Sequence, residues 1–93
     1  MKEAINLNAE VRRGQEAKRL LESELFLDVR KKFTERTFQA FKKASADDAE
    51  SLRKIKVLDM LTTQFFAELE QCVKTGQLAA IQIDEMKRKQ NRR

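Results

Sequence analysis

Apolar residues recur at steps of three and four along most of the chain, which is the spacing of one face of a helix. Small and aliphatic residues form the stripe in residues 8–21, and aromatic residues dominate it in residues 23–44. A wider aliphatic and aromatic stripe follows in residues 49–75. The pattern therefore predicts three helices over these ranges, the first beginning near Asn8.

Two short segments separate the predicted helices. Ser23 is a suitable N-cap for the second helix. The segment "SADD" at residues 45–48 contains two possible capping boxes, Ser45 with Asp48 or Asp47 with Glu50. So short a connection between long helices favours an antiparallel return, so we expect an elongated helical hairpin with an additional N-terminal helix.

Gly14 lies on the apolar stripe of the first predicted helix, together with Ala17. Glycine inside a helix costs about 1 kcal/mol relative to alanine, so its presence calls for a compensating contact. We expect Gly14 and Ala17 to let the first helix lie close to the aromatic-rich hairpin. The alternative is that Gly14 marks a break and the helix begins only there.

The C-terminal segment is harder to assign. Gly76 follows Lys74 and Thr75, as the glycine after a helix end commonly does, so we expect the third helix to end at Thr75. Residues 77–86 fit either a short final helix or an extended segment around "IQI". Residues 87–93 are too polar to fold alone, so we predict one helical domain over residues 1–86 and a disordered basic tail over 87–93.

Composition supports an all-α fold. The chain has 93 residues, no proline and two glycines, so it lacks the turn residues that a β fold needs. The single cysteine, Cys72, has no partner for an intramolecular disulfide and fits a reducing compartment. It lies on the apolar stripe, and we expect it to act as a small hydrophobic residue. There is no long apolar run, so we expect no membrane span and a location in the cytoplasm.

The basic residues are unevenly distributed. Residues 25–46 carry six basic and two acidic side chains, and residues 77–93 carry five and two. Such clusters favour a salt-dependent contact with nucleic acid phosphates, although they also fit an ordinary solvated surface. The candidate residues for nucleic-acid binding are Arg30, Lys31, Arg36, Lys42, Lys43, Lys87, Arg88, Lys89, Arg92 and Arg93.

The residues needed for common catalytic sites are missing from the sequence. It has no histidine, no pair of cysteines and no glycine-rich phosphate loop. Its one dense acidic cluster, around Asp47 and Asp48, is explained by helix capping. We therefore expect no enzymatic activity, no cofactor, no metal and no small-molecule substrate.

The phenylalanines are more numerous than a two-helix core requires. We expect the core to consist of Phe26, Phe33, Leu58, Phe65, Phe66 and Leu69. Surplus rings then need cover from the first helix or from another subunit. The candidate residues for a protein interface are Gly14, Ala17, Phe38, Phe41, Phe65 and Phe66.

Four segments, "RGQEAKRLL", "ADDAE", "LRKIKVLD" and "VKTGQLA", together resemble a group of short bacteriophage proteins. The similarity covers about residues 12–80. The matching positions are Arg13, Gly14, Ala17, Leu20, Leu21, Asp47, Thr75, Gly76, Leu78 and Ala79. That group is associated with virion structure and DNA-packaging genes, so the resemblance implies a phage origin and an assembly role, and it supplies no active-site residues.

The sequence thus predicts a small phage assembly or virion-associated protein that acts through contacts between helices. Its expected partners are other phage proteins or further copies of itself, in the host cytoplasm or in the virion. One alternative is a nucleic-acid-binding accessory protein that uses the basic second helix and the tail. Another is a small phage inhibitor of a host protein.

Overall fold

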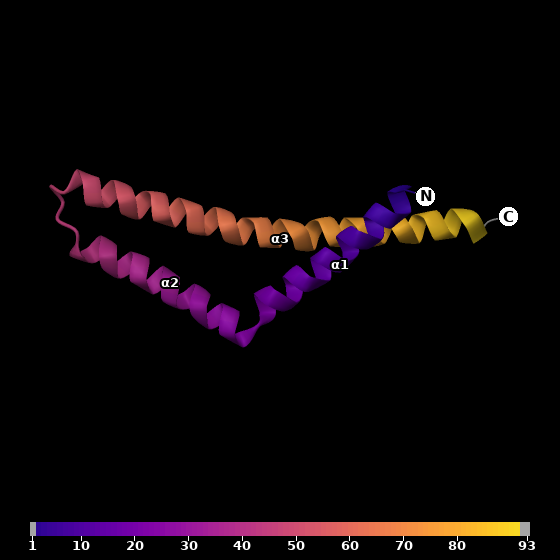
Figure 1. Ribbon diagram of the computed structural model, residues 1–93, viewed down its shortest axis with the longest axis horizontal. Coiled ribbons are helices and arrows are strands. Elements are labelled where there is room, and N and C mark those ends of the chain that lie inside the picture. Colours follow the sequence, from indigo (N-terminus) through magenta and orange to yellow (C-terminus); the bar gives the residue numbers. More distant parts are fainter. Residues whose placement is uncertain (1, 92–93) are drawn as a thin grey trace. The chain divides into compact units, whose positions relative to one another are not determined.

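The computed structural model describes the backbone of residues 2–91 and the side chains of residues 6–91. It contains three helices, α1 (Lys2–Glu22), α2 (Glu24–Lys43) and α3 (Ala49–Asn91), and no strand among the described residues (Figure 1). The predicted all-α class is confirmed. Of the predicted tail residues, Arg92 and Arg93 lie outside the described part of the chain.

Helix α1 is longer than the sequence pattern predicts. It begins at Lys2 and not near Asn8. Residues 2–7 contain neither proline nor glycine, so nothing in the sequence stops the helix before Asn8. Gly14 lies inside α1, so the alternative in which the helix begins at Gly14 is wrong.

Helix α2 begins where the sequence predicts. The Ser23 hydroxyl accepts a hydrogen bond from the backbone N–H of Phe26 at 3.5 Å, which confirms Ser23 as its N-cap. At the other end the backbone N–H of Ala44 donates to the carbonyl of Ala40 at 3.1 Å. The chain then leaves the helix in an extended conformation at Ala44.

The cap of α3 differs from both predicted capping boxes. Asp48 Oδ1 accepts a hydrogen bond from the Ser51 N–H at 3.1 Å, and the Ser51 hydroxyl donates to Asp48 Oδ2 at 2.7 Å. The Ser45 hydroxyl instead accepts from the Asp47 N–H at 3.3 Å, within the turn. Asp48 is therefore the N-cap, because α3 begins at Ala49, and Ser51 donates to its carboxylate from both the backbone N–H and the hydroxyl.

The C-terminal end of α3 departs most from the expectation. The helix passes through Gly76 and continues to Asn91, so the predicted end at Thr75 and the extended "IQI" segment are both wrong. Neither glycine has a positive φ, so Gly76 does not form a helix-ending turn. Residues 87–91 are helical where a disordered tail was expected.

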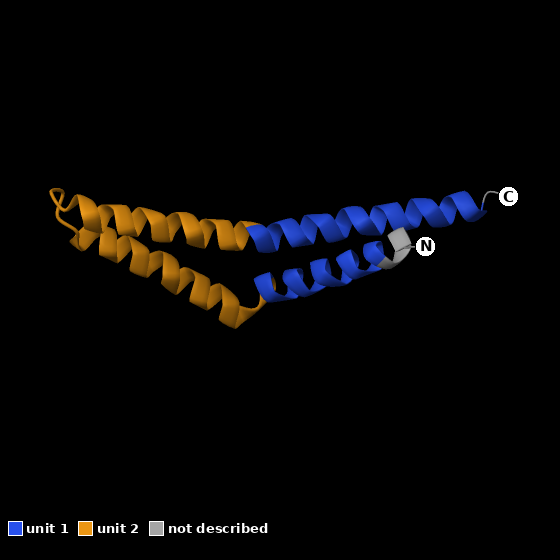
Figure 2. Ribbon diagram, turned by 45° about the horizontal axis from the view of Figure 1, so that its top comes forward, with its two compact units in different colours: residues 1–21, 68–93 blue, residues 22–67 orange. Residues whose placement is uncertain are grey.

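The chain divides into two compact units (Figure 2). Unit 1 consists of residues 1–21 and 68–93, and unit 2 consists of residues 22–67. In each unit two helical segments lie side by side in opposite directions: α1 with the second half of α3, and α2 with its first half.

Little of the chain is fully buried. Among the described residues, the buried hydrophobic side chains are Ala17, 6% exposed, and Ala79, 1% exposed, both in unit 1. The expected core is wrong for Phe33, Leu58 and Phe65, which are 44%, 43% and 58% exposed. Phe26, Phe66 and Leu69 are half-buried. Two helices bury only the seam between them, so the flanks of each apolar stripe stay open.

Candidate functional site

The helices of unit 1 meet at two glycines. A Cβ atom added to Gly14 would lie 2.9 Å from the Cα of Gly76 and 3.0 Å from the Cys72 carbonyl oxygen. The predicted close approach at Gly14 is therefore present, but the neighbour is the backbone of α3 and not an aromatic ring. Cys72 contributes this carbonyl, while the residue itself is exposed, contrary to its expected burial.

The crossing is reciprocal. A Cβ atom added to Gly76 would lie 2.9 Å from the Cα of Gly14 and 3.0 Å from the Glu10 carbonyl oxygen. Each glycine therefore faces the other, and each would clash with the carbonyl four residues before the other. Ala17 and Ala79, both three residues after a glycine, are buried. This is the arrangement expected for a local two-fold axis between the helices.

An internal repeat underlies this symmetry. The segments Gly14-Gln15-Glu16-Ala17 and Gly76-Gln77-Leu78-Ala79 share a Gly-Gln-x-Ala pattern. The match extends in both directions, and the paired positions are all buried or half-buried. The pairs are Leu7 with Leu69, Val11 with Val73, Gly14 with Gly76, Ala17 with Ala79, and Leu21 with Ile83. Comparison of the chain with itself would have revealed the role of Gly76, which the sequence reasoning missed.

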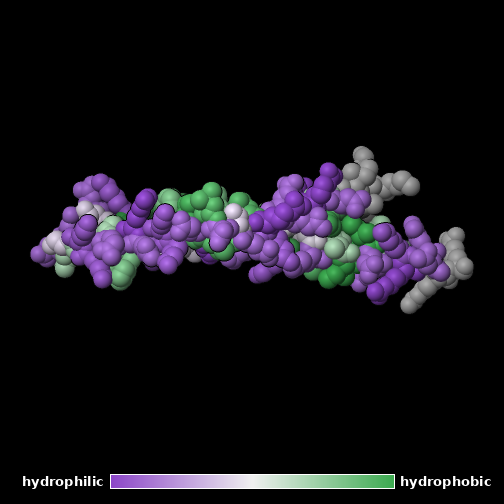
Figure 3. Space-filling model, turned by 90° about the horizontal axis from the view of Figure 1, so that it is seen from below, coloured by the Kyte–Doolittle hydropathy of each residue, from purple (hydrophilic) through white to green (hydrophobic). Residues whose placement is uncertain are grey.

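Unit 2 has a different surface, an open groove between its helices with a volume of about 290 Å³. Seven of its eight lining residues are uncharged and six of them are hydrophobic. We call this surface the aromatic groove, and it is lined by Phe26, Val29, Arg30, Phe33, Leu61, Thr62, Phe65 and Phe66. Figure 3 shows hydrophobic residues gathered into patches between polar stretches of the surface.

Phe66 is the centre of the ring contacts in the groove. Its ring centroid lies 5.6 Å from that of Phe26 and 5.6 Å from that of Phe65, both in edge-to-face geometry. The Arg30 guanidinium carbon lies 4.3 Å from the same centroid, which is a cation–π contact. Arg30 is thus part of the groove lining, and half-buried, where the sequence suggested a phosphate-binding cation.

The expected protein-interface residues fall into three places. Gly14 and Ala17 are buried within unit 1. Phe65 and Phe66 line the aromatic groove. Phe38 and Phe41 lie on α2, 54% and 56% exposed, outside the groove lining.

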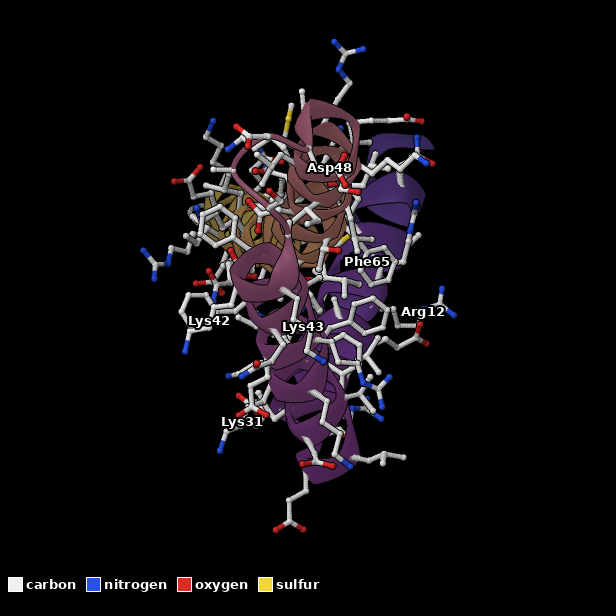
Figure 4. The ribbon with its side chains drawn as sticks, turned by 90° about the vertical axis from the view of Figure 1, so that its left-hand side faces the viewer. Arg12, Lys31, Lys42, Lys43, Asp48 and Phe65 are labelled. Atoms are coloured by element: carbon white, nitrogen blue, oxygen red, sulfur yellow. The ribbon has the colours of Figure 1, made fainter. Side chains whose placement is uncertain are left out.

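The basic residues of α2 lie at the surface. Lys31, Arg36, Lys42 and Lys43 are all exposed. Figure 4 shows Lys31 and Lys42 projecting to the opposite side of unit 2 from Phe65. The Lys42 ammonium nitrogen lies 4.8 Å from the Phe38 ring centroid. Lys31 and Lys42 are therefore directed away from Phe65, whereas Arg30 is part of the aromatic groove.

The basic residues near the C-terminus continue α3. Lys87, Arg88 and Lys89 are exposed, and Arg88 forms an ion pair with Asp84 at 3.2 Å. Part of this charge is therefore compensated one turn away. An exposed ion pair of this kind adds little stability.

Leu61 is a groove residue that the sequence analysis named neither in the core nor in the interface. It is 60% exposed, four residues before Phe65 and three after Leu58. This spacing places the three side chains on one flank of α3, beside the seam that Thr62 and Phe66 occupy. A search for a second apolar stripe next to the main one would have found it.

No helix in the described part of the chain is long and apolar enough to cross a membrane. Over the same residues, no three acidic or cysteine side chains gather closely enough to hold a metal ion. Comparisons with protein-family models, curated proteins and solved structures find no match for this chain.

Proposed function

We propose that this chain is a small bacteriophage assembly or virion-associated protein that acts through contacts between helices and catalyses no reaction. The observation that carries the proposal is the exposure of the aromatic groove. Val29, Phe33, Leu61 and Phe65 are each between 44% and 60% exposed along one surface. Contiguous apolar surface of this kind typically marks a protein-interaction site.

The geometry of the groove fits a helical partner. Four of the groove's lining residues come from α2 and four from α3, and all but Arg30 are uncharged. An amphipathic helix or helical pair places side chains at three- and four-residue steps into such a groove. The elongated hairpin expected from the short turn is the architecture that this mode of binding uses. The contact of Phe26 on α2 with Phe66 on α3 supports this hairpin.

The phage context comes from the resemblance of the sequence to short phage proteins. It suggests other virion proteins or further copies of the chain as partners, in the host cytoplasm or in the particle. The exposed groove provides a physical reason for such a role, because a protein that functions inside an assembly buries its apolar surface only there.

Deletion of the gene from the phage that encodes this chain tests the proposal. We expect the lysate to contain fewer complete particles by electron microscopy, with assembly restored when the full chain is supplied from a plasmid. Normal yield and morphology of particles in the deletion would contradict an assembly role.

Nucleic-acid binding is a second candidate, favoured by the exposed Lys31, Arg36, Lys42 and Lys43 on α2. A contact with several phosphates weakens steeply as salt rises. This candidate predicts weak DNA binding at low salt that is indifferent to base sequence and is lost when residues 87–93 are removed or when salt is raised. Titration of the nucleic-acid-free protein with DNA at two salt levels distinguishes it from the assembly role.

A further inference from the structure

We propose that the aromatic groove of unit 2 is a self-association surface, occupied by the same groove of a second copy of the chain. The inference rests on the proposed assembly function and identifies a second copy of the chain as the partner bound by the groove. Two copies related by a two-fold axis would place two helices on two helices. That arrangement is a four-helix bundle in which each groove covers the other.

The exposed area of the chain is the first argument. The protein exposes 8207 Å². A folded monomer of its mass, 10.9 kDa, exposes about 5,600 Å², so roughly 2,600 Å² per chain is in excess. Obligate homodimers bury about 2,000–5,000 Å² in total, or about 1,000–2,500 Å² per chain. Exposed large hydrophobic side chains in both units contribute to this excess, for example Ile81 in unit 1 and Phe65 in unit 2, and the aromatic groove holds part of it.

The groove itself supplies the apolar centre of such an interface. Side chains of this size present about 150–250 Å² each, so exposures of 44–60% leave on the order of 100 Å² per residue. Phe33, Leu61 and Phe65 with Val29 and the adjacent Leu58 then offer about 500 Å² per copy. Two copies would bury about 1,000 Å² of apolar area before any polar rim is counted, which is about the lower limit for a specific interface.

The chemistry of the groove favours a copy of itself over a charged partner. Its one charged lining residue, Arg30, already lies over the Phe66 ring of the same chain. The other lining residues carry no formal charge, so repulsion between two grooves is limited to the two Arg30 side chains. The exposed Lys31 and Lys42 project to the opposite side of unit 2 from Phe65, so they lie away from the proposed interface (Figure 4).

The other open surfaces of the molecule fit this role less well. A groove in unit 1 is lined by Val11, Ile81 and Ile83, but also by Asp84 and Lys87, with Asn8. Phe38 and Phe41 are as exposed as Phe65, but they lie outside the aromatic groove. The aromatic groove is lined by apolar residues of both helices, which a four-helix bundle requires.

The test is the solution mass of the purified full-length protein, free of nucleic acid, measured by light scattering from about 1 to 200 µM at two salt levels. We expect a dimer that persists at high salt. Phe65→Glu and Leu61→Glu should each weaken dimerisation about 100-fold or more, because each places a charge in the apolar centre of the interface. Leu61 makes none of the ring contacts of Phe66, so it remains informative if Phe65→Glu unfolds.

The matched control is Phe38→Glu, which makes the same change at a similarly exposed phenylalanine, 54% against 58%. It should leave the dimer intact, because Phe38 lies outside the groove and the new carboxylate is four residues from Lys42. Far-UV circular dichroism of each variant checks that the helices are retained.

Three results would overturn the inference. The first is a wild-type monomer at every concentration, the second is a dimer that tolerates both groove variants, and the third is equal weakening by Phe38→Glu. The phage deletion is independent of these measurements. If the protein is a monomer but deletion of its gene still blocks particle formation, the self-association is wrong and the assembly function stands. If the protein forms a groove-dependent dimer but the deletion gives normal particles, the self-association stands and the assembly function is wrong.

Discussion

In unit 1 the helices meet at Gly14 and Gly76, where no side chain separates their backbones. In unit 2 they meet at Phe26 and Phe66, whose ring centroids are 5.6 Å apart. Both are antiparallel pairs formed with the same long helix, α3. The two contacts hold helices together by different means, close approach of backbones in one and bulky side chains in the other.

The difference determines how much of each seam is closed. Small residues let the helices of unit 1 approach until Ala17 and Ala79 are buried. The rings of unit 2 fill the seam at Phe66 but leave an open groove beside it, where Leu61 and Phe65 are more than half exposed. The seam formed by the bulky rings is therefore the one with an open apolar groove beside it.

The largest effect on this comparison is expected from Gly14→Leu. The side chain would meet the backbone of Gly76 and Cys72, which cannot move without separating the helices. We expect a loss of about 3 kcal/mol in the free energy of unfolding, measured by urea denaturation followed by circular dichroism. Gln15→Leu, at the exposed neighbouring position, is the control and should change stability by less than about 0.5 kcal/mol. Equal effects of the two would contradict the close crossing.

In unit 2 we expect truncation of a ring in the seam, and not enlargement of a side chain, to lower the free energy of unfolding. Phe66→Ala deletes the ring that contacts Phe26, Phe65 and Arg30, and we expect a loss of about 2 kcal/mol, below the value for a fully buried ring. Phe38→Ala, at an exposed ring, should cost less than about 0.5 kcal/mol. The same denaturation experiment measures both, and a Phe38→Ala loss as large as that of Phe66→Ala would show that the rings of unit 2 are not distinguished by burial.

The smallest effect is expected at the cap of α3. Hydrogen bonds from the Ser51 side chain, and then from its backbone N–H, hold the pKa of Asp48 below its ordinary value of 3.8. A carboxyl whose pKa falls on folding stabilises the fold above 3.8, and this contribution is lost as the pH drops through the lower folded value. Asp48→Asn should therefore melt slightly below the wild type at neutral pH.

That difference in Tm should shrink as the pH is lowered below 3.8, because the wild-type carboxyl then also becomes neutral. Thermal melts over a pH series measure it. A difference that is constant with pH would show that the charge of Asp48 does not contribute.

Much of the local structure could be predicted from the sequence. Three- and four-residue spacing identified helices over most of α1, α2 and the first part of α3, and Ser23 was recognised as a cap. The turn at residues 45–48 was found, but its cap was not, because Asp47, Asp48 and Ser45 are all suitable acceptors within one turn. Only the residue at which α3 begins decides among them.

The predicted interface residues overlap the aromatic groove in part. Phe65 and Phe66 were identified, while Leu61 was missed and Phe38 and Phe41 lie outside the groove. An apolar stripe that is wider than one seam shows that some side chains stay uncovered, but not which ones. That depends on which neighbouring helix lies against the stripe and at what rotation.

The sequence by itself determined that the chain is helical, because helix formers, periodic apolar residues and the absence of proline act locally along the backbone. It also indicated that Gly14 needs a close neighbour. The tertiary structure decided that this neighbour is Gly76, and with it the length of α3. A glycine after Thr75 permits either a helix end or a close crossing. Only the backbone that lies against it, 62 residues away in the chain at Gly14, selects between them.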